Sequence, residues 1–304
     1  EKKAIYYMLE SDYISGTDIC LLLYSQHVLE EDDDYQGLLS GSLSAKNFMY
    51  NKIYNLEITP DMLALPPCSG SFVLTDINTG KVKALVSYPG YDANQINNVS
   101  YYASLINNSS SPLYNRATQQ TLAPGSTFKP ISAIAGLEEG VIDADTYITD
   151  YVEYTKVVPH ANCWNSAGHG TINVEQAIEY SCNYFFYEVG YRLGSKDNTT
   201  ELNDSTGLAL LAKYAKMFGL DSVSGLELPE TTPRISDESV VRSAIGQATH
   251  NYTAAELARY VTAIANSGNL YQLSVLDKIT DSEGNVLEKN EPKLTNKIEL
   301  KQST

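Results

Sequence analysis

Residues 115–136, NRATQQTLAPGSTFKPISAIAG, carry the densest chemical signal in the chain. A Pro-Gly pair predicts a turn, and the apolar residues that follow predict a buried helix that begins at Ser126 and ends at Gly136 or Gly140. Lys129 lies three residues after Ser126, so both side chains are expected on one face of the first helical turn, with Cβ atoms about 5–6 Å apart. This spacing allows direct proton transfer between the hydroxyl and the amine.

A serine hydroxyl needs an adjacent base to act as a nucleophile, and lysine serves only if its pKa falls from about 10.4 toward 7–8. Burial against apolar neighbours and the positive end of the helix dipole both lower the pKa of Lys129. The alternative is that Ser126 only caps a helix and that Lys129 is solvated. The pattern S-x-x-K occurs once in the chain and opens an apolar helix, which favours the catalytic interpretation.

A second polar pair, Ser181 and Asn183, lies inside an apolar run that starts at Ile172. Asn173 and Gln176 form a possible capping box at the start of this run. Short polar side chains compete with the helix backbone for hydrogen bonds, so Ser-Cys-Asn predicts a helix break or a polar face turned inward. A second S-x-N copy later in the chain is typical of an ordinary helix C-terminal turn.

The order PGSTFKP, S-C-N and IGQATHNYTAAELARYVTAIANSG resembles the transpeptidase domain of penicillin-binding proteins, most of all the class B, monofunctional type. The segment GSFVLTDINTGKVKALVSYPGYDAN resembles the opening β-hairpin of that family, and the resemblance covers roughly residues 67–287. It implies an α+β fold of the serine β-lactamase and transpeptidase kind, in which an antiparallel sheet packs against a helical cluster. A helical linker or docking segment is expected over residues 1–65, before a transpeptidase domain over residues 66–304 that is incomplete at its C-terminus.

The third motif of the family, K-[ST]-G on a strand beside the active site, does not occur in this sequence. Residues 78–81, NTGK, have the letters in reverse order and form a predicted hairpin turn between the β-rich runs FVLTDI and KVKALVSY. We expect the natural protein to continue past Thr304 with this motif, and this chain alone to be inactive or weakly active. The alternative is a degenerate, inactive relative.

The resemblance implies a role for each motif residue. Ser126 would attack the carbonyl of the penultimate D-alanine in a peptidoglycan stem peptide, with Lys129 as general base. Ser181 would relay the proton to the leaving D-alanine, and Asn183 would position Lys129 and bind the substrate amide. β-Lactams would acylate Ser126 by mimicking the D-Ala-D-Ala terminus. This chemistry implies no cofactor.

Three further residues are candidates for substrate binding. Trp164, the single tryptophan, lies in C-W-N-S-A-G-H-G, which resembles the family loop whose tryptophan lines the site entrance. Gly246 and Gln247 form a turn before a helix with the capping box Thr253 and Glu256. That turn is a candidate for approaching the site, and structural packing is its alternative role.

Four cysteines are too few and too scattered to predict a disulfide framework, although a single bridge stays open. Cys182 is expected to pack as a small apolar residue. His160, Cys163 and His169 offer three metal ligands in one run, but the run lacks a fourth ligand at the usual zinc spacing. No metal site is therefore expected.

The net charge of −16 argues against nucleic acid or an anionic membrane face as the main partner. No run of 18 apolar residues is present, so no transmembrane helix is expected in the chain. The resemblance implies an N-terminal anchor preceding Glu1, a catalytic domain on the extracytoplasmic face of the bacterial cell membrane, and membrane proteins of cell-wall synthesis as partners.

Three other functional classes share part of this pattern. A serine β-lactamase or D,D-carboxypeptidase would transfer the acyl group to water. A β-lactam sensor domain would be acylated without turnover. A catalytically inactive scaffold of the wall-building machinery is the interpretation if K-[ST]-G is truly missing.

Local patterns predict the remaining elements. Thr17 or Asp18 is expected to cap a helix, and residues 45–53 to form another. The acidic residues 30–34 are expected to form a loop, and residues 91–113 a long surface loop that leads to the active-site helix.

Overall fold

The computed structural model describes residues 7–8, 11, 13–58, 68–195 and 201–304. The chain forms two compact units, residues 1–69 with 107–110 and residues 70–106 with 111–304. Among the described residues, no helix is both long enough and apolar enough to cross a membrane.

The first unit contains three described helices, α2 (Gly16–Ser25), α3 (Asp33–Ser40) and α4 (Ala45–Tyr54). They enclose a small apolar core made by Cys20, Leu23, Tyr24, Leu38, Phe48 and Ile58. The predicted cap of α2, Thr17 or Asp18, is wrong, because Ser15 caps this helix. Asp18 completes the capping box from the third helical position. The predicted acidic loop is wrong at its end, because the Asp32 side chain caps α3.

A buried lysine joins the acidic segment of this unit to α4. Lys52 is 2% exposed, and its Nζ lies 3.0 Å from a carboxylate oxygen of Asp34 and 2.6 Å from one of Glu57. It also forms an ion pair with Asp32. Burial alone would lower the pKa of Lys52, but the hydrogen bonds to these carboxylates raise it. The cation therefore stays charged inside the unit.

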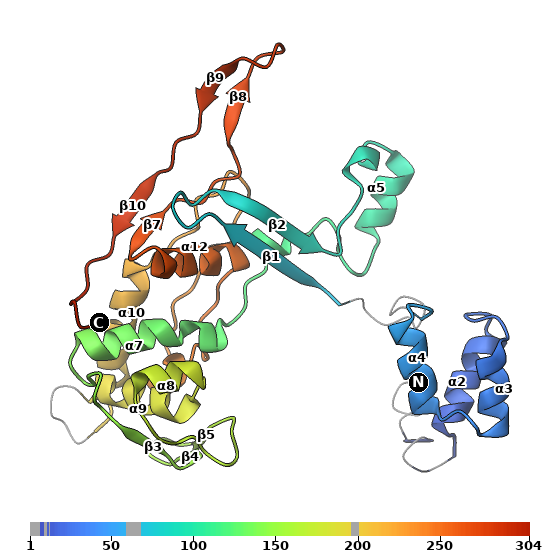
Figure 1. Cartoon of the computed structure of the whole chain (residues 1–304), viewed down its shortest axis with the longest axis horizontal. Helices are drawn as coiled ribbons and strands as arrows, with labels where there is room; N and C mark the ends of the chain where they lie inside the picture. The colour runs from blue at the N-terminus through green and yellow to red at the C-terminus, as the bar shows by residue number, and fades with distance from the viewer. Residues whose placement is uncertain (1–6, 9–10, 12, 59–67, 196–200) are drawn as a thin grey trace. The chain divides into compact units, whose positions relative to one another are not determined.

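The second unit begins with an antiparallel hairpin, β1 (Gly70–Thr75) and β2 (Val82–Tyr88), as the sequence predicts. Gly80 takes a positive φ of 70° in its turn. One face of the hairpin packs against α12 (Ala254–Ala265), and Figure 1 shows the two elements side by side.

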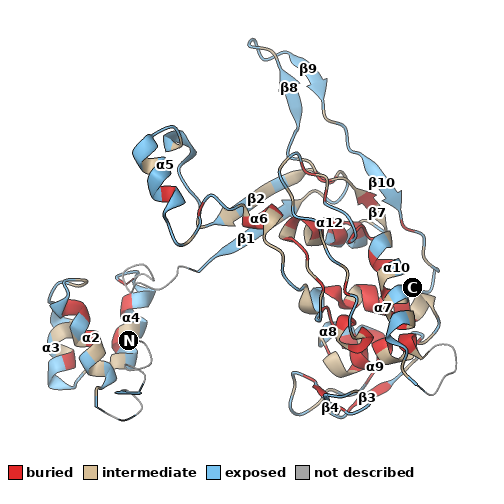
Figure 2. Cartoon of the chain, turned by 180° about the vertical axis from the view of Figure 1, so that it is seen from behind, coloured by how far each residue is buried: buried red, intermediate tan, exposed pale blue. Residues whose placement is uncertain are grey.

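A helical cluster forms the main core of this unit. Its described helices are α6 (Arg116–Gln119), α7 (Lys129–Glu138), α8 (Val174–Glu179), α9 (Asn183–Gly194), α10 (Asp204–Met217), α11 (Val240–Ser243) and α12. Helix α9 packs against α7, α10 and α11. Figure 2 shows that buried residues concentrate on α7, α9 and α12. The core therefore lies where the predicted motif helices meet.

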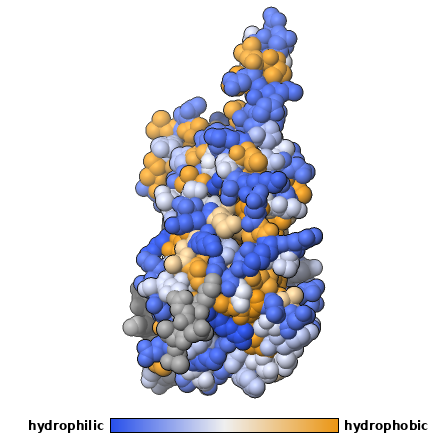
Figure 3. Space-filling model, turned by 90° about the vertical axis from the view of Figure 1, so that its left-hand side faces the viewer, coloured by the Kyte–Doolittle hydropathy of each residue, from blue (hydrophilic) through white to orange (hydrophobic). Residues whose placement is uncertain are grey.

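The remaining described strands form short antiparallel pairs. These pairs are β3 (Ile148–Asp150) with β6 (Gly170–Ile172), β4 (Glu153–Tyr154) with β5 (Ala161–Asn162), β7 (Asn269–Tyr271) with β10 (Leu294–Lys297), and β8 (Lys278–Thr280) with β9 (Val286–Lys289). The hairpin of β8 and β9 projects from the unit, and Figure 3 shows apolar side chains on it. Ile279, Val286 and Leu287 are exposed there.

The predicted loop over residues 91–113 is wrong in its middle, where α5 (Val99–Ile106) forms. The Asn98 side chain accepts hydrogen bonds from the backbone N–H groups of Ser100 and Tyr101, which satisfies donors in the first helical turn. The abundance of asparagine and serine that predicts a loop thus also supplies a helix cap.

Candidate active site

The turn that carries Ser126 is a 3₁₀ helix, Gly125–Phe128, and α7 follows directly from Lys129. The Ser126 side chain is exposed, whereas Lys129 is 2% exposed. The predicted helix is confirmed, but its regular part begins three residues later than expected. It ends before Gly140, which takes a φ of 70° and is the second of the two predicted ends.

The amine of Lys129 lies among oxygen atoms of the Ser-Cys-Asn segment. Its Nζ donates to the carbonyl oxygen of Ser181 at 2.7 Å, to Ser181 Oγ at 3.0 Å and to Asn183 Oδ1 at 2.7 Å. The structure therefore brings three of the four predicted catalytic side chains into direct contact. The fourth, Ser126, lies three residues before Lys129 at the exposed start of the same helical segment.

The helix break predicted at Ser-Cys-Asn is present. Helix α8 ends at Glu179, Ser181 takes a positive φ of 52°, and α9 begins at Asn183. Cys182 caps α9, because its sulfur accepts a hydrogen bond from the backbone N–H of Phe185 at 3.4 Å. The break turns the carbonyl and hydroxyl of Ser181 toward Lys129 instead of into a helix ladder.

Burial lowers the pKa of Lys129 from 10.5 to about 8. The Phe186 ring lies beside the amine, with its centroid 5.7 Å from Nζ. A pKa of about 8 leaves roughly a tenth of the amines neutral at pH 7, compared with about one in 3,000 at the ordinary pKa. Lys129 thus meets the electrostatic requirement for a general base.

Trp164 lies next to this cluster, as expected. Its indole Nε1 donates to the carbonyl oxygen of Ser181 at 3.0 Å, the same oxygen that Lys129 contacts. The residue is nevertheless 65% exposed, so most of the ring is available to a bound molecule.

The Gly246–Gln247 turn lies against the turn that carries Ser126. The backbone N–H of Gly125 donates to the carbonyl oxygen of Gly246 at 2.9 Å. Gly246 takes a φ of 73°, and an added Cβ would overlap the Gly125 carbonyl oxygen and lie 2.8 Å from Phe128 Cβ. The exposed Gln247 side chain lies beside Gly125, because a Cβ there would be 3.6 Å from its Nε2.

Four potential metal ligands meet beneath the Ser181 turn. One donor atom from each of Asp150, Cys163, His169 and Cys182 lies within 4.8 Å of the others. The sulfurs are 3.9 Å apart, and His169 Nδ1 lies 2.7 Å from Asp150 Oδ2. The contact with the Cys182 thiol lowers the pKa of Cys163, which favours a thiolate.

Two thiols, an imidazole and a carboxylate are a donor set that suits tetrahedral zinc. Of the three potential ligands in the sequence run, Cys163 and His169 belong to this cluster. His160 does not, because its Nδ1 lies 3.0 Å from a carboxylate oxygen of Glu153. Cys182 packs in the apolar core of the second unit, as expected, and its thiol also donates to Asp150 Oδ2 at 3.4 Å.

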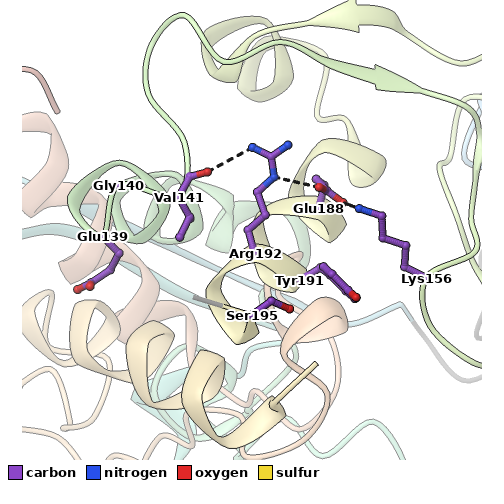
Figure 4. Close-up of a pocket in the computed structure, with 8 residues that line it drawn as sticks. All are labelled: Glu139, Gly140, Val141, Lys156, Glu188, Tyr191, Arg192 and Ser195. Atoms are coloured by element: carbon purple, nitrogen blue, oxygen red, sulfur yellow. Dashed lines mark hydrogen bonds and ion pairs between the residues drawn. The ribbon is translucent and has the colours of Figure 1, made fainter. Parts of the chain in front are cut away.

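A separate pocket of about 450 Å³ contains none of the predicted site residues (Figure 4). It lies near the C-terminal end of α9, whereas Asn183 begins that helix. Its buried Glu188 binds Lys156 at 2.7 Å and Arg192 at 2.9 Å. The charges that face this pocket are therefore largely paired with one another.

Comparisons with known proteins identify the family of the chain. The model of the penicillin-binding protein transpeptidase domain matches residues 70–304. The peptidoglycan D,D-transpeptidase MrdA of Acinetobacter baumannii is 29% identical over 220 residues, 66% of this chain and 31% of that protein. The peptidoglycan D,D-transpeptidase PbpA of Mycolicibacterium smegmatis is 32% identical over 218 residues, 66% of this chain and 42% of that protein.

A solved structure has the same fold. The imipenem acyl-enzyme complex of penicillin-binding protein A from M. tuberculosis superposes with a TM-score of 0.65 and 26% identity, over 76% of this chain and 53% of that chain. The predicted α+β transpeptidase fold is therefore confirmed. The chain spans about a third of the MrdA relative. Because the family model covers most of its length, this chain belongs to the penicillin-binding protein transpeptidase family.

Proposed function

We propose that this protein is a serine-type peptidoglycan D,D-transpeptidase with Ser126 as its nucleophile. The observation that carries the proposal is the buried Lys129 amine, whose pKa is lowered and which contacts Ser181 and Asn183. Relatives that share the family are named peptidoglycan D,D-transpeptidases, and a related structure is a β-lactam acyl-enzyme.

In the proposed reaction, neutral Lys129 takes the proton of Ser126 Oγ as this oxygen bonds to the carbonyl carbon of the penultimate D-alanine. The tetrahedral intermediate then breaks its C–N bond and leaves an acyl-enzyme. Ser181 Oγ, which lies 3.0 Å from Lys129 Nζ, passes the proton to the departing D-alanine amine. An amine of a neighbouring stem peptide then takes the acyl group, which forms the cross-link and restores the Ser126 hydroxyl.

Three neighbouring groups support this chemistry. Asn183 Oδ1 holds the Lys129 amine, and its amide N–H₂ is available to a substrate carbonyl. The backbone N–H of Ser126 is proposed as one donor of an oxyanion hole. The exposed ring of Trp164 and the Gly246–Gln247 turn are proposed to border the bound stem peptide.

The proposal extends to partners and location. Peptidoglycan stem peptides are the substrates and β-lactams the inhibitors. The catalytic domain works on the extracytoplasmic face of the bacterial cell membrane, held there by an N-terminal anchor and assembled with membrane proteins of wall synthesis. Residues 1–65 are proposed to serve as a linker or docking segment, and residues 66–304 as the transpeptidase domain.

The full-length gene product should be incubated with a donor pentapeptide ending in D-Ala-D-Ala and an acceptor peptide amine, and the products identified by mass. We expect D-alanine release together with a cross-linked dimer, both lost in Ser126→Ala and Lys129→Met. Lys213→Met removes an exposed amine that pairs with Glu139 and should retain activity.

The other functional classes give different products. D-Alanine release without a dimer at any acceptor concentration would indicate a carboxypeptidase. Stable acylation by penicillin without peptide turnover would indicate a sensor, and hydrolysis of penicillin a β-lactamase. Absence of both turnover and acylation would indicate a scaffold, and each of these results would overturn the transpeptidase proposal.

A further inference from the structure

The turn that carries Ser126 is weakly specified by its own residues. It is a 3₁₀ segment of four residues, and Pro124 at its start provides no side-chain cap. Gly125 takes a φ of 56°, and the start of α7 at Phe128 likewise lacks a side-chain cap. Short 3₁₀ segments have poor hydrogen-bond geometry. Within the turn, the Thr127 hydroxyl donates to the Pro124 carbonyl oxygen at 2.8 Å, and contacts from elsewhere in the chain supply the other restraints on the Ser126 backbone.

Residues 236–252, here called the supporting segment, form hydrogen bonds with the residues of this turn and those just before it. The backbone groups of Leu122 and Tyr252 pair in both directions, each at 2.9 Å. Gly125 N–H donates to the Gly246 carbonyl oxygen, also at 2.9 Å. The turn and the residues that lead into it are thus hydrogen-bonded to this distant segment.

His250 lies near the end of the supporting segment and is 3% exposed. Its ring centroid is 4.2 Å from that of Phe128, the last residue of the Ser126 turn. The backbone N–H of Ser236 donates to Nδ1 at 3.1 Å, so Nδ1 is an acceptor. Nε2 therefore carries the proton and donates to the carbonyl oxygen of Ser243 at 3.2 Å.

The His250 ring thus contacts two segments that hold the turn carrying Ser126. It packs directly on Phe128, and through Ser243 it holds the chain that leads into Gly246. The backbone N–H of Gly246 also donates to the Ser243 carbonyl oxygen, at 2.9 Å. His250 consequently fixes both the side chain that ends the Ser126 turn and the carbonyl that binds its first residue.

A second buried ring holds the turn from another element. Tyr260 of α12 donates its hydroxyl to the Thr127 carbonyl oxygen at 3.0 Å and is almost fully buried. Tyr260 therefore contacts the residue that follows Ser126, whereas His250 contacts Phe128. Together the two rings leave the turn little freedom to rotate.

We infer that His250 is a positioning residue for the acyl-transfer reaction, and that it holds the Ser126 backbone at the geometry from which Oγ attacks. The inference rests on the proposed nucleophilic function of Ser126. A displacement of about 1 Å at a nucleophile can reduce a rate by about 100-fold, so a side chain that never touches substrate can still control catalysis. Burial lowers the pKa of His250 to about 4, so the ring is neutral near pH 7 and supplies position instead of a proton.

Hydrogen exchange on this chain tests the contact without requiring activity. His250→Phe keeps an aromatic ring against Phe128 but removes the acceptor for Ser236 and the donor to Ser243. We expect the peptide covering residues 122–132 to exchange at least 10-fold faster, while peptides of α10 are unchanged. His250→Gln retains one acceptor and one donor, and should restore part of the protection.

Tyr154→Phe is the matched control. It removes a buried hydroxyl that donates to Glu188 at 2.8 Å, away from the Ser126 turn. Its exchange over residues 122–132 should stay within about 2-fold of wild type. If His250→Phe does not fold, His250→Gln is compared with wild type in its place, and Tyr260→Phe removes the α12 hydroxyl that donates to the turn and should accelerate exchange in the same peptide.

Acylation of the full-length gene product by a fluorescent penicillin supplies the functional readout. At a temperature well below the unfolding midpoint of each variant, His250→Phe should lower the second-order rate constant by about 10–100-fold, and Tyr154→Phe should not. Unchanged exchange over residues 122–132, or faster exchange with unchanged acylation, would overturn the positioning role. Failure of wild type itself to acylate would refute the proposed function. Equal acylation rates of wild type and His250→Phe would refute only the positioning role of His250.

Discussion

Replacing the buried Lys129 by methionine should change how the stability of the second unit depends on pH. Burial lowers the pKa of the amine from 10.5 to about 8 in the folded chain. Between these values the unfolded chain holds a proton that the folded chain has lost. The free energy of unfolding therefore rises as the pH rises through this window, and protonated Lys129 destabilises the folded unit most at neutral pH and below.

The size of the effect follows from the shift, which is 10.5 − 8, or about 2.5 pKa units. This corresponds to about 3 kcal/mol at pH 7, of which about 1 kcal/mol remains at pH 10. Lys129→Met has no titrating group at this site and keeps an unbranched side chain of similar length. From pH 7 to pH 10, the free energy of unfolding of wild type should therefore rise by about 2–3 kcal/mol more than that of Lys129→Met.

Urea unfolding followed by the fluorescence of Trp164 measures this difference, because the single tryptophan belongs to the second unit. The variant also loses the hydrogen bonds to Ser181 and Asn183. This loss lowers its free energy of unfolding by a similar amount at pH 7 and pH 10, so it largely cancels when the two pH values are compared. Lys213→Met is the control, since its exposed amine has a raised pKa and should give a small change of opposite sign. A difference between wild type and Lys129→Met that stays constant from pH 7 to pH 10 would refute the lowered pKa.

Three further predictions follow from other parts of the chain. Gly246→Ala should destabilise the second unit by about 3 kcal/mol or more in calorimetry, whereas Gly140→Ala, with a similar φ but open space around it, should lose only about 1 kcal/mol. Lys52→Met should destabilise the first unit by about 1–3 kcal/mol at pH 7. The hydrogen bonds from Lys52 help to hold the pKa values of Asp32 and Glu57 below their ordinary values, so the difference should narrow only as the pH falls below those ordinary values; a difference as large at about pH 2 as at pH 7 would contradict this. Zinc added to the reduced, metal-free chain should raise the unfolding midpoint of wild type much more than that of Cys182→Ser, and equal rises would rule out this thiol as a ligand.

The parts of the site that sequence predicts are those governed by local chemistry. The apolar run after Ser126 indicates α7, and the capping boxes at Asn173 and Thr253 mark the starts of α8 and α12. The break at Ser181 follows because short polar side chains compete with helix hydrogen bonds. Each of these signals acts over a few residues and needs no knowledge of the tertiary fold.

The parts that sequence misses depend on residues far apart in the chain. Asp150 and Cys182 are separated by 32 positions, so the run from His160 to His169 considered alone lacked a fourth ligand and predicted no metal site. His250 carries no motif, and its role follows from contacts with Phe128 and Ser243 that form only in the folded chain. A sequence pattern could have singled out this histidine only through its place next to the Gly246 turn.

Labelling of the full-length gene product with a fluorescent penicillin, followed by intact mass and peptide mapping, is the most direct measurement of the central claim. We predict a single adduct on the peptide that contains Ser126, absent from Ser126→Ala and present in Thr127→Ala. An adduct on any other residue, or no adduct on the full-length protein, would contradict Ser126 as the nucleophile.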